Sequence, residues 1–160
     1  MSIIRWCVAA AGFALAAGAA AQEKAKNELP DAVAKALEKA GEVEVYSIQP
    51  NHADKGGWRG YKVLGKTTVK KGDQKTVSTA VKAAVEEGVP GARCFVPRHG
   101  IRVAHGGKTY DLVICFECHW VYVFTDDSDK PTVLTISEAP QKAINKILTG
   151  AKVPLAKEEK

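Results

Sequence analysis

Most side chains that could carry out chemistry lie within one stretch, residues 92–124. It holds three of the four cysteines and three of the four histidines of the 160-residue chain. Thiolates and imidazoles are common nucleophiles and metal ligands in proteins, and two thiols can also form a disulfide. Any chemistry is therefore expected in this stretch, and the candidates are Cys94, His99, His105, Cys115, Cys118 and His119.

The segment Cys115-Phe116-Glu117-Cys118-His119 matches C-x-x-C-H and resembles the attachment site of c-type haem. That resemblance implies thioether bonds from Cys115 and Cys118, with His119 as an iron ligand. The only methionine is Met1, so a second iron ligand would have to be another histidine. Known attachment sites lie on a helix and turn, whereas β-branched and aromatic residues flank this motif.

The same two cysteines form C-x-x-C, which resembles the redox motif of thioredoxin-like oxidoreductases. In that family a helix N-terminus lowers the pKa of the first thiol. No helical pattern follows Cys118, so this interpretation requires a reversible thiol pair on a different framework.

A metal centre is a third hypothesis, with zinc or copper as the metal. On one continuous strand, Cys115, Glu117 and His119 share a face, and His99 lies across from them. Positions i and i+4 of a strand are about 13 Å apart, so one ion could bridge them only if the strand bulges.

The segment Arg98-His99-Gly100-Ile101-Arg102 resembles the R-H-G-x-R motif of histidine acid phosphatases. The resemblance covers five residues and implies that His99 accepts a phosphoryl group while the two arginines hold phosphate. About sixty residues follow the motif, without the α/β layering of that family. The competing interpretation is the start of a strand, with Arg98 and Arg102 facing solvent.

A structural disulfide is the simplest role for two of the thiols. If the strand pairing continues past Pro97 with a slip of one residue, Cys94 lies opposite Cys118. Their bond would close a loop of 25 residues, which is worth about 3.5 kcal/mol in the chain-entropy model. Cys115 would remain as the odd thiol, because Cys115 and Cys118 point to opposite faces of a regular strand.

The pair Gly106-Gly107 predicts a two-residue hairpin turn, since both residues tolerate positive φ. The turn places His105 opposite Lys108 and His99 opposite Ile114. We expect one long strand over residues 108–124, central in its sheet because both faces are largely apolar.

The first 21 residues have the pattern of a signal peptide: Arg5, an apolar run and an Ala19-Ala20-Ala21 cleavage site. Cleavage between Ala21 and Gln22 would send the protein to the periplasm or outside the cell. The rest is divided into a flexible segment (22–28), a single domain (29–156) and a polar tail (157–160). No later segment predicts a membrane span, and scattered lysines in a chain of net charge +5 do not predict nucleic-acid binding.

Hydrophobic periodicity predicts helices over residues 30–41 and 74–87 and a last helix capped by Ser137. It predicts strands over 42–48, 58–69 and 132–136 besides the hairpin, with a loop at 50–57. This order predicts an α+β fold in which an antiparallel sheet of about five strands carries helices mainly on one face.

Together these features predict an exported globular protein. The default interpretation is a non-enzymatic binding or structural module centred on the cysteine- and histidine-rich hairpin. A periplasmic redox protein that uses haem, metal or thiol chemistry is the alternative, and a phosphatase is the second alternative. No cofactor is assigned, with haem c, zinc and copper as the candidates, and the sequence names no partner.

Overall fold

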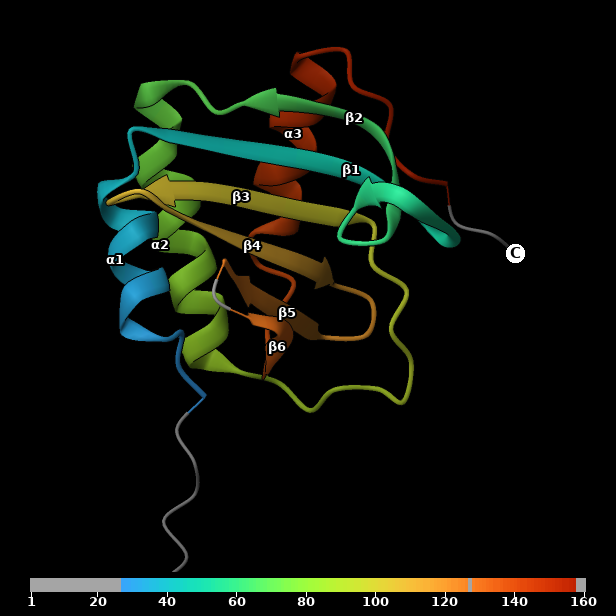
Figure 1. Cartoon of the computed structure of the whole chain (residues 1–160), viewed down its shortest axis with the longest axis horizontal. Helices are drawn as coiled ribbons and strands as arrows, with labels where there is room; N and C mark the ends of the chain where they lie inside the picture. Colours follow the sequence, from blue (N-terminus) through green and yellow to red (C-terminus); the bar gives the residue numbers. More distant parts are fainter. Residues whose placement is uncertain (1–26, 127, 158–160) are drawn as a thin grey trace, which may run out of the picture.

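The computed structural model describes residues 27–126 and 128–157. The expected signal peptide, most of the expected flexible segment and the last three residues lie outside them. The elements are drawn in Figure 1 and follow the order α1 (Asp31–Lys39), β1 (Glu42–Trp58), β2 (Tyr61–Thr68), α2 (Lys71–Glu87), β3 (His99–His105), β4 (Lys108–Cys115), β5 (Trp120–Thr125), β6 (Ser128–Thr135) and α3 (Gln141–Gly150).

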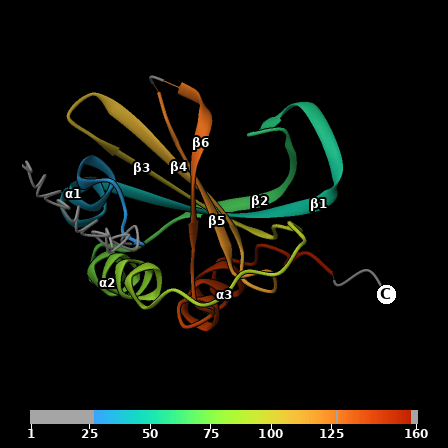
Figure 2. The ribbon, with the colours of Figure 1, turned by 90° about the horizontal axis from the view of Figure 1, so that it is seen from below.

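The strands form one antiparallel sheet in the order β2-β1-β3-β4-β5-β6. Figure 2 shows the three helices on one side of this sheet, while the far parts of β1 and β2 curl toward the other side. The predicted α+β class is confirmed. The sheet has six strands where about five were expected, because the stretch predicted as one strand after Gly107 is two.

The β3–β4 hairpin forms with the predicted register. His105 pairs with Lys108 and His99 with Ile114, and both turn glycines, Gly106 and Gly107, have positive φ (60° and 76°). A side chain is disfavoured at such angles, so the Gly-Gly pair fixes where the chain reverses. Strand β4 lies between β3 and β5, which confirms its predicted interior position.

The predicted continuous strand over 108–124 is wrong. Strand β4 ends at Cys115, the chain turns, and β5 returns alongside it with Trp120 paired to Cys115. The backbone N–H of His119 donates to the carbonyl oxygen of Phe116 at 3.2 Å, and His119 has φ 58°. His119 adopts a left-handed conformation at the end of this turn. Glycine and asparagine, the residues that usually signal this conformation in a sequence, are both absent from the turn. We call residues 115–119 the C-x-x-C turn.

The predicted loop at residues 50–57 is also wrong, because these residues continue strand β1 as far as Trp58. Their pairing with β2 contains three register shifts, between Ser47 and Ile48 and on either side of Ala53. Such irregularities increase twist and bend a strand. They allow β1 to curl, so that Trp58 packs back onto Gly100 of β3.

The two faces of the sheet bury separate apolar clusters. On β4, Leu112 and Ile114 join the larger cluster beneath the helices, whereas Val113 joins a smaller one on the opposite face. The smaller cluster is mainly aromatic and also contains Tyr46, Ile48 and Trp58, with Tyr61, Val63, Phe95, Tyr122 and Phe124 packed against it. Both faces of the central hairpin are therefore covered, as its apolar composition predicted.

The predicted helix boundaries are shifted. Helix α2 begins at Lys71 rather than Gln74, α1 ends at Lys39 with Ala40 rather than Gly41 as its C-cap, and Pro140 rather than Ser137 precedes α3. Asn27, within the expected flexible segment 22–28, bonds through its side chain to backbone groups of Val85 and Thr135. Among the described residues there is no helix with the length and apolar character needed to cross a membrane.

Candidate functional site

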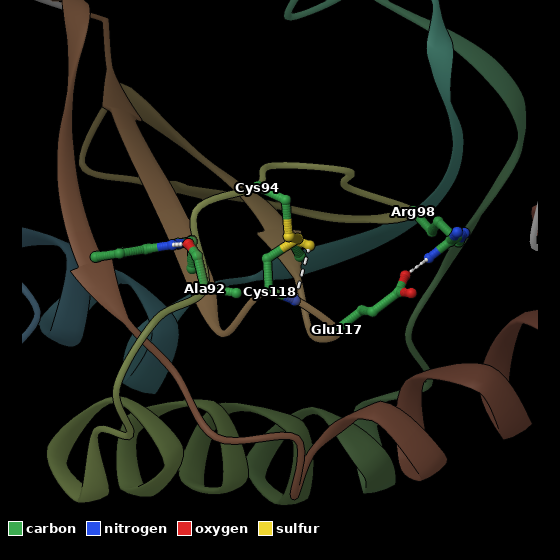
Figure 3. Close-up of a disulfide and its surroundings, with 7 residues drawn as sticks. Ala92, Cys94, Arg98, Glu117 and Cys118 are labelled. Carbon is green, nitrogen blue, oxygen red and sulfur yellow. Dashed lines mark hydrogen bonds and ion pairs between the residues drawn. A yellow bond between two sulfur atoms is a disulfide. The ribbon is translucent and has the colours of Figure 1, made fainter.

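The C-x-x-C turn is joined to the segment that precedes β3. Cys94 and Cys118 have their sulfur atoms within disulfide-bonding distance and their Cα atoms 5.8 Å apart, as Figure 3 shows. This Cα separation is typical of a disulfide. The pair predicted from the sequence is therefore brought together, although by a turn rather than by a continued strand register.

Two hydrogen bonds and one close packing contact hold the same segments together. The backbone N–H of Ala92 donates to the carbonyl oxygen of Cys118 at 3.0 Å, and Trp120 Nε1 donates to the carbonyl oxygen of Ala92 at 2.7 Å. A Cβ on Gly91 would lie 2.2 Å from the Trp120 ring, so only glycine fits there. The attachment of residues 91–94 to the turn thus does not depend on sulfur alone.

Cys115 is the free cysteine of the described residues, as predicted, and it is 1% exposed. Its sulfur accepts a hydrogen bond from the backbone N–H of Cys118 at 3.1 Å and another from the backbone of Val96. Burial raises the pKa of the Cys115 thiol, and these two bonds and the charge of Arg98 only partly offset that effect. The thiol is therefore fixed in position and protonated at neutral pH.

A polar pocket of about 380 Å³ opens beside the turn. Its walls come from the segment leading into β3, the C-x-x-C turn, the start of α3 and the segment after α3. Most of the side chains that line the pocket are polar, whereas Phe116 and Leu155 contribute apolar surface. The polar lining residues are Arg98, His99, Glu117, Glu138, Gln141 and Asn145.

Arg98 is the cationic group of this pocket. One of its terminal nitrogens, Nη1, makes an ion pair with Glu117 of the turn, as drawn in Figure 3. Its Nε is buried and has no hydrogen-bond partner among the described residues. The expectation that Arg98 faces solvent is therefore wrong, since its side chain is 16% exposed.

His99 lies at the floor of the pocket and is 6% exposed. Its Nε2 is 2.7 Å from Asn145 Oδ1 of α3, and its ring meets Phe116 edge-on at 5.1 Å between centroids. Burial lowers the pKa of His99, and the bond to Asn145 opposes this only in part. The imidazole is thus neutral near pH 7, with Nε2 as the donor to the Asn145 oxygen.

The phosphatase-like motif is not assembled around His99. Arg102 bonds through Nε and Nη2 to Asp111 at 2.7 and 2.8 Å, and Arg59 Nε reaches the same carboxylate at 2.6 Å. This fully buried Asp111 belongs to the sheet face opposite the helices, and its carboxylate raises the pKa of Arg102. The Arg102 side chain is 36% exposed and is paired with Asp111, so it does not join Arg98 in holding a phosphate.

The structure does not bring together the four residues of the metal hypothesis. That hypothesis placed Cys115, Glu117 and His119 on one strand face opposite His99, but the strand ends at Cys115. Among the side chains that the structure describes, those of residues 27–50, 55–126 and 128–157, no three histidine, cysteine or acidic groups are arranged to hold one ion. For haem, a bonded Cys94–Cys118 pair would leave Cys115 alone where two thiols are needed.

Sequence reasoning identified Arg98, His99 and Glu117 but missed Glu138, Gln141 and Asn145. The latter lie on or just before α3, and His99 and Asn145 are 46 positions apart in the chain. No local motif signals a contact of this range. The sequence pattern around α3 predicted only a last helix capped by Ser137.

Comparisons with models of protein families, with curated proteins and with solved structures find no match to this chain.

Proposed function

We propose that this protein is an exported binding module and that the polar pocket at the end of the central hairpin holds its ligand. The observation that carries the proposal concerns Arg98, a pocket-lining residue whose Nε is a buried donor without a hydrogen-bond partner among the described residues. Buried donors in native proteins nearly always have an acceptor, and an orphan points to a bound water or ligand. Export rests on the signal-peptide pattern of residues 1–21.

The pocket chemistry defines a ligand class. The guanidinium group of Arg98 can donate to a carboxylate or carbonyl oxygen of the ligand. Glu138 and Glu117 can accept from an ammonium or hydroxyl group, and Phe116 offers apolar contact. A small molecule with both an acceptor oxygen and a positively charged amine fits this set, and amino acids and short peptides have that composition.

The support for binding rather than turnover lies in how the candidate catalytic groups are held. His99 is buried and hydrogen-bonded to Asn145, and Cys115 is buried within the C-x-x-C turn and does not line the pocket. The Cys94 and Cys118 pair, which we propose is oxidised after export, does not line the pocket but joins the segment before β3 to the turn that supplies Phe116 and Glu117 to it. A preorganised wall reduces the entropy lost when a ligand binds.

A ligand screen with two lysine substitutions tests the proposal. Amino acids, dipeptides, polyols and carboxylic acids would be ranked by the thermal shift they produce and then titrated by calorimetry. Arg98→Lys keeps the charge but removes the Nε donor. Because a hydrogen bond to a charged group is worth about 1.5–3 kcal/mol, we expect Arg98→Lys to weaken binding about tenfold or more.

Arg93→Lys is the matched control, since Arg93 is exposed and does not line the pocket. It should bind as tightly as the wild type. Equal affinities of Arg98→Lys and the wild type for every ligand that binds would refute the assignment of this pocket. So would a screen in which compounds with both amine and acceptor groups do no better than plain polyols.

A further inference from the structure

The C-x-x-C turn gathers three sulfur atoms, which the proposed ligand site does not use. Cys118 is fully buried and lies at disulfide distance from Cys94, whose side chain is exposed. The Cys115 sulfur lies 3.1 Å from the backbone nitrogen of Cys118. Cys118 thus lies at disulfide distance from Cys94 through its sulfur and at hydrogen-bond distance from the free thiol of Cys115 through its backbone N–H.

We propose that Cys115 exchanges with the Cys94–Cys118 disulfide, so that the turn interconverts two disulfide isomers. The thiolate of Cys115 attacks Cys118 Sγ, a Cys115–Cys118 bond forms, and the Cys94–Cys118 bond breaks. The departing Cys94 thiolate takes up a proton equivalent to the one that Cys115 lost. The number of disulfides and thiols is unchanged, and no external oxidant or reductant takes part.

The turn geometry favours this exchange. On a continuous strand, residues 115 and 118 would point to opposite faces, but the turn closed by the His119 to Phe116 hydrogen bond brings the backbone N–H of Cys118 to the Cys115 sulfur. The hydrogen bond from Cys118 N–H holds the Cys115 sulfur beside its target. Two N–H donors on one sulfur also stabilise the thiolate that must form before attack.

The segment that carries Cys94 would stay in place after the exchange. Ala92 remains bonded to the carbonyl of Cys118 and to the Trp120 indole, and Gly91 stays packed on the Trp120 ring. The reverse reaction therefore remains available. In the second isomer the free thiol is the exposed Cys94, where thiol-reactive compounds and disulfides in the solvent can reach it, while the other pair is enclosed.

Labelling followed by peptide mapping distinguishes the isomers. Oxidised full-length protein would be incubated with N-ethylmaleimide at pH 7 and pH 9 without denaturant, then digested after all thiols are blocked. Trypsin places Cys94 in the fragment 94–98 and both other cysteines in the fragment 109–142, and cleavage after Glu117 separates those two. Cys7, where retained, lies in its own fragment.

We expect the label on Cys94, together with a Cys115–Cys118 link, and faster labelling at pH 9 because more Cys115 is ionised there. Cys115→Ala should abolish the Cys94 label. A label on Cys115 with Cys94 and Cys118 still linked would overturn the exchange. An equal Cys94 label in Cys115→Ala would also overturn it.

A second variant keeps the inference testable if Cys115→Ala does not fold. Cys94→Ser leaves Cys115 and Cys118, besides Cys7 where it is retained, and mild oxidation should then link Cys115 to Cys118 within one 109–142 fragment. Two free thiols after oxidation of the folded variant would show that the turn cannot hold this bond. Neither outcome depends on whether the polar pocket binds a ligand.

Discussion

The indole ring of Trp120 occupies the space that a β-carbon on Gly91 would need. The calculated separation from a Gly91 Cβ to the Trp120 Cε2 atom is 2.2 Å, far inside van der Waals contact. This contact lets residues 91–94 lie flat against the C-x-x-C turn. It makes Gly91 a structural requirement of the site wall although it carries no functional group.

Gly91→Ala should therefore destabilise the protein by about 1–3 kcal/mol, the range for overpacking a well-packed site. Urea unfolding followed by tryptophan fluorescence measures the loss. Gly72→Ala is the matched control, because no atom lies within 4 Å of the added Cβ in the first turn of α2. Alanine favours the helix there, so this control should be neutral or up to about 1 kcal/mol more stable. Equal effects of the two substitutions would contradict the packing argument.

Asp111→Asn should lower the free energy of unfolding, because it removes the negative charge between Arg59 and Arg102 on the sheet face opposite the helices. Asp111 is fully buried while the two arginines remain partly exposed. Breaking a buried pair from one side typically costs about 3–5 kcal/mol, and the partial exposure of the arginines places the expected loss near the lower end. Chemical denaturation measures it.

Asp129→Asn, at an exposed position in β6, is the control for Asp111→Asn and should change stability by less than about 0.5 kcal/mol. If Asp111→Asn proves as mild as the control, the buried charges do not hold the curled β1–β2 hairpin on the sheet.

His99 should make stability depend on pH. Its folded pKa is lowered from 6.5, mainly by burial, so between the folded and unfolded pKa values the unfolded chain binds more protons. Its contribution is complete above pH 6.5 and is lost as the pH falls from there toward the folded value. Urea midpoints between pH 5 and pH 8 would show the decline.

His99→Gln should flatten this decline, whereas His105→Gln, at the end of β3, should leave it intact. A pH profile unchanged by His99→Gln would show that another group titrates. Burial raises the pKa of Glu44, but hydrogen bonds from Lys66 and Tyr46 outweigh it and lower that pKa. Its contribution is therefore complete above the ordinary value of 4.5 and is lost only as the pH falls below it, outside this window.

Reduction of the Cys94–Cys118 bond should lower the free energy of unfolding. The bond spans a sequence separation of 24, and a closed loop of that size contributes about 3.5 kcal/mol in the chain-entropy model. Unfolding curves with and without a reductant measure the difference. Intact mass should first show that the oxidised sample lacks two hydrogen atoms. A negligible difference in unfolding free energy would then mean that the other contacts of residues 91–94 already fix this segment.

The sequence predicted the centre of the fold because that part depends on local signals. Gly106-Gly107 determines the β3–β4 register, and the alternation of Leu112, Val113 and Ile114 assigns the faces of β4. The next turn was missed because His119 takes a left-handed conformation that β-forming neighbours do not signal. Here the C-x-x-C spacing itself was the only local sign of a turn.

The curl of β1 and the polar pocket were missed for a different reason. Pro50 and the Gly56-Gly57 pair are typical of a loop, and only the pairing with β2 makes their surroundings a strand. The pocket combines Arg98, Glu117 and Glu138 from three separate elements. Such combinations depend on tertiary packing, which hydrophobic periodicity does not encode.

The most direct measurement of the central claim is the NMR signal of the Arg98 Nε–H group. A buried guanidinium Nε–H exchanges slowly and gives its own cross-peak in a nitrogen–proton correlation spectrum, which Arg98→Lys would assign by its loss. Titration with the best amine- and acceptor-bearing ligand should shift this peak and the side-chain amide peaks of Gln141 and Asn145 in parallel. Saturation of binding with these three signals unmoved would contradict the account, and shifts confined to Thr67 and Ile147 would place the ligand in the separate pocket between β2, α2 and α3.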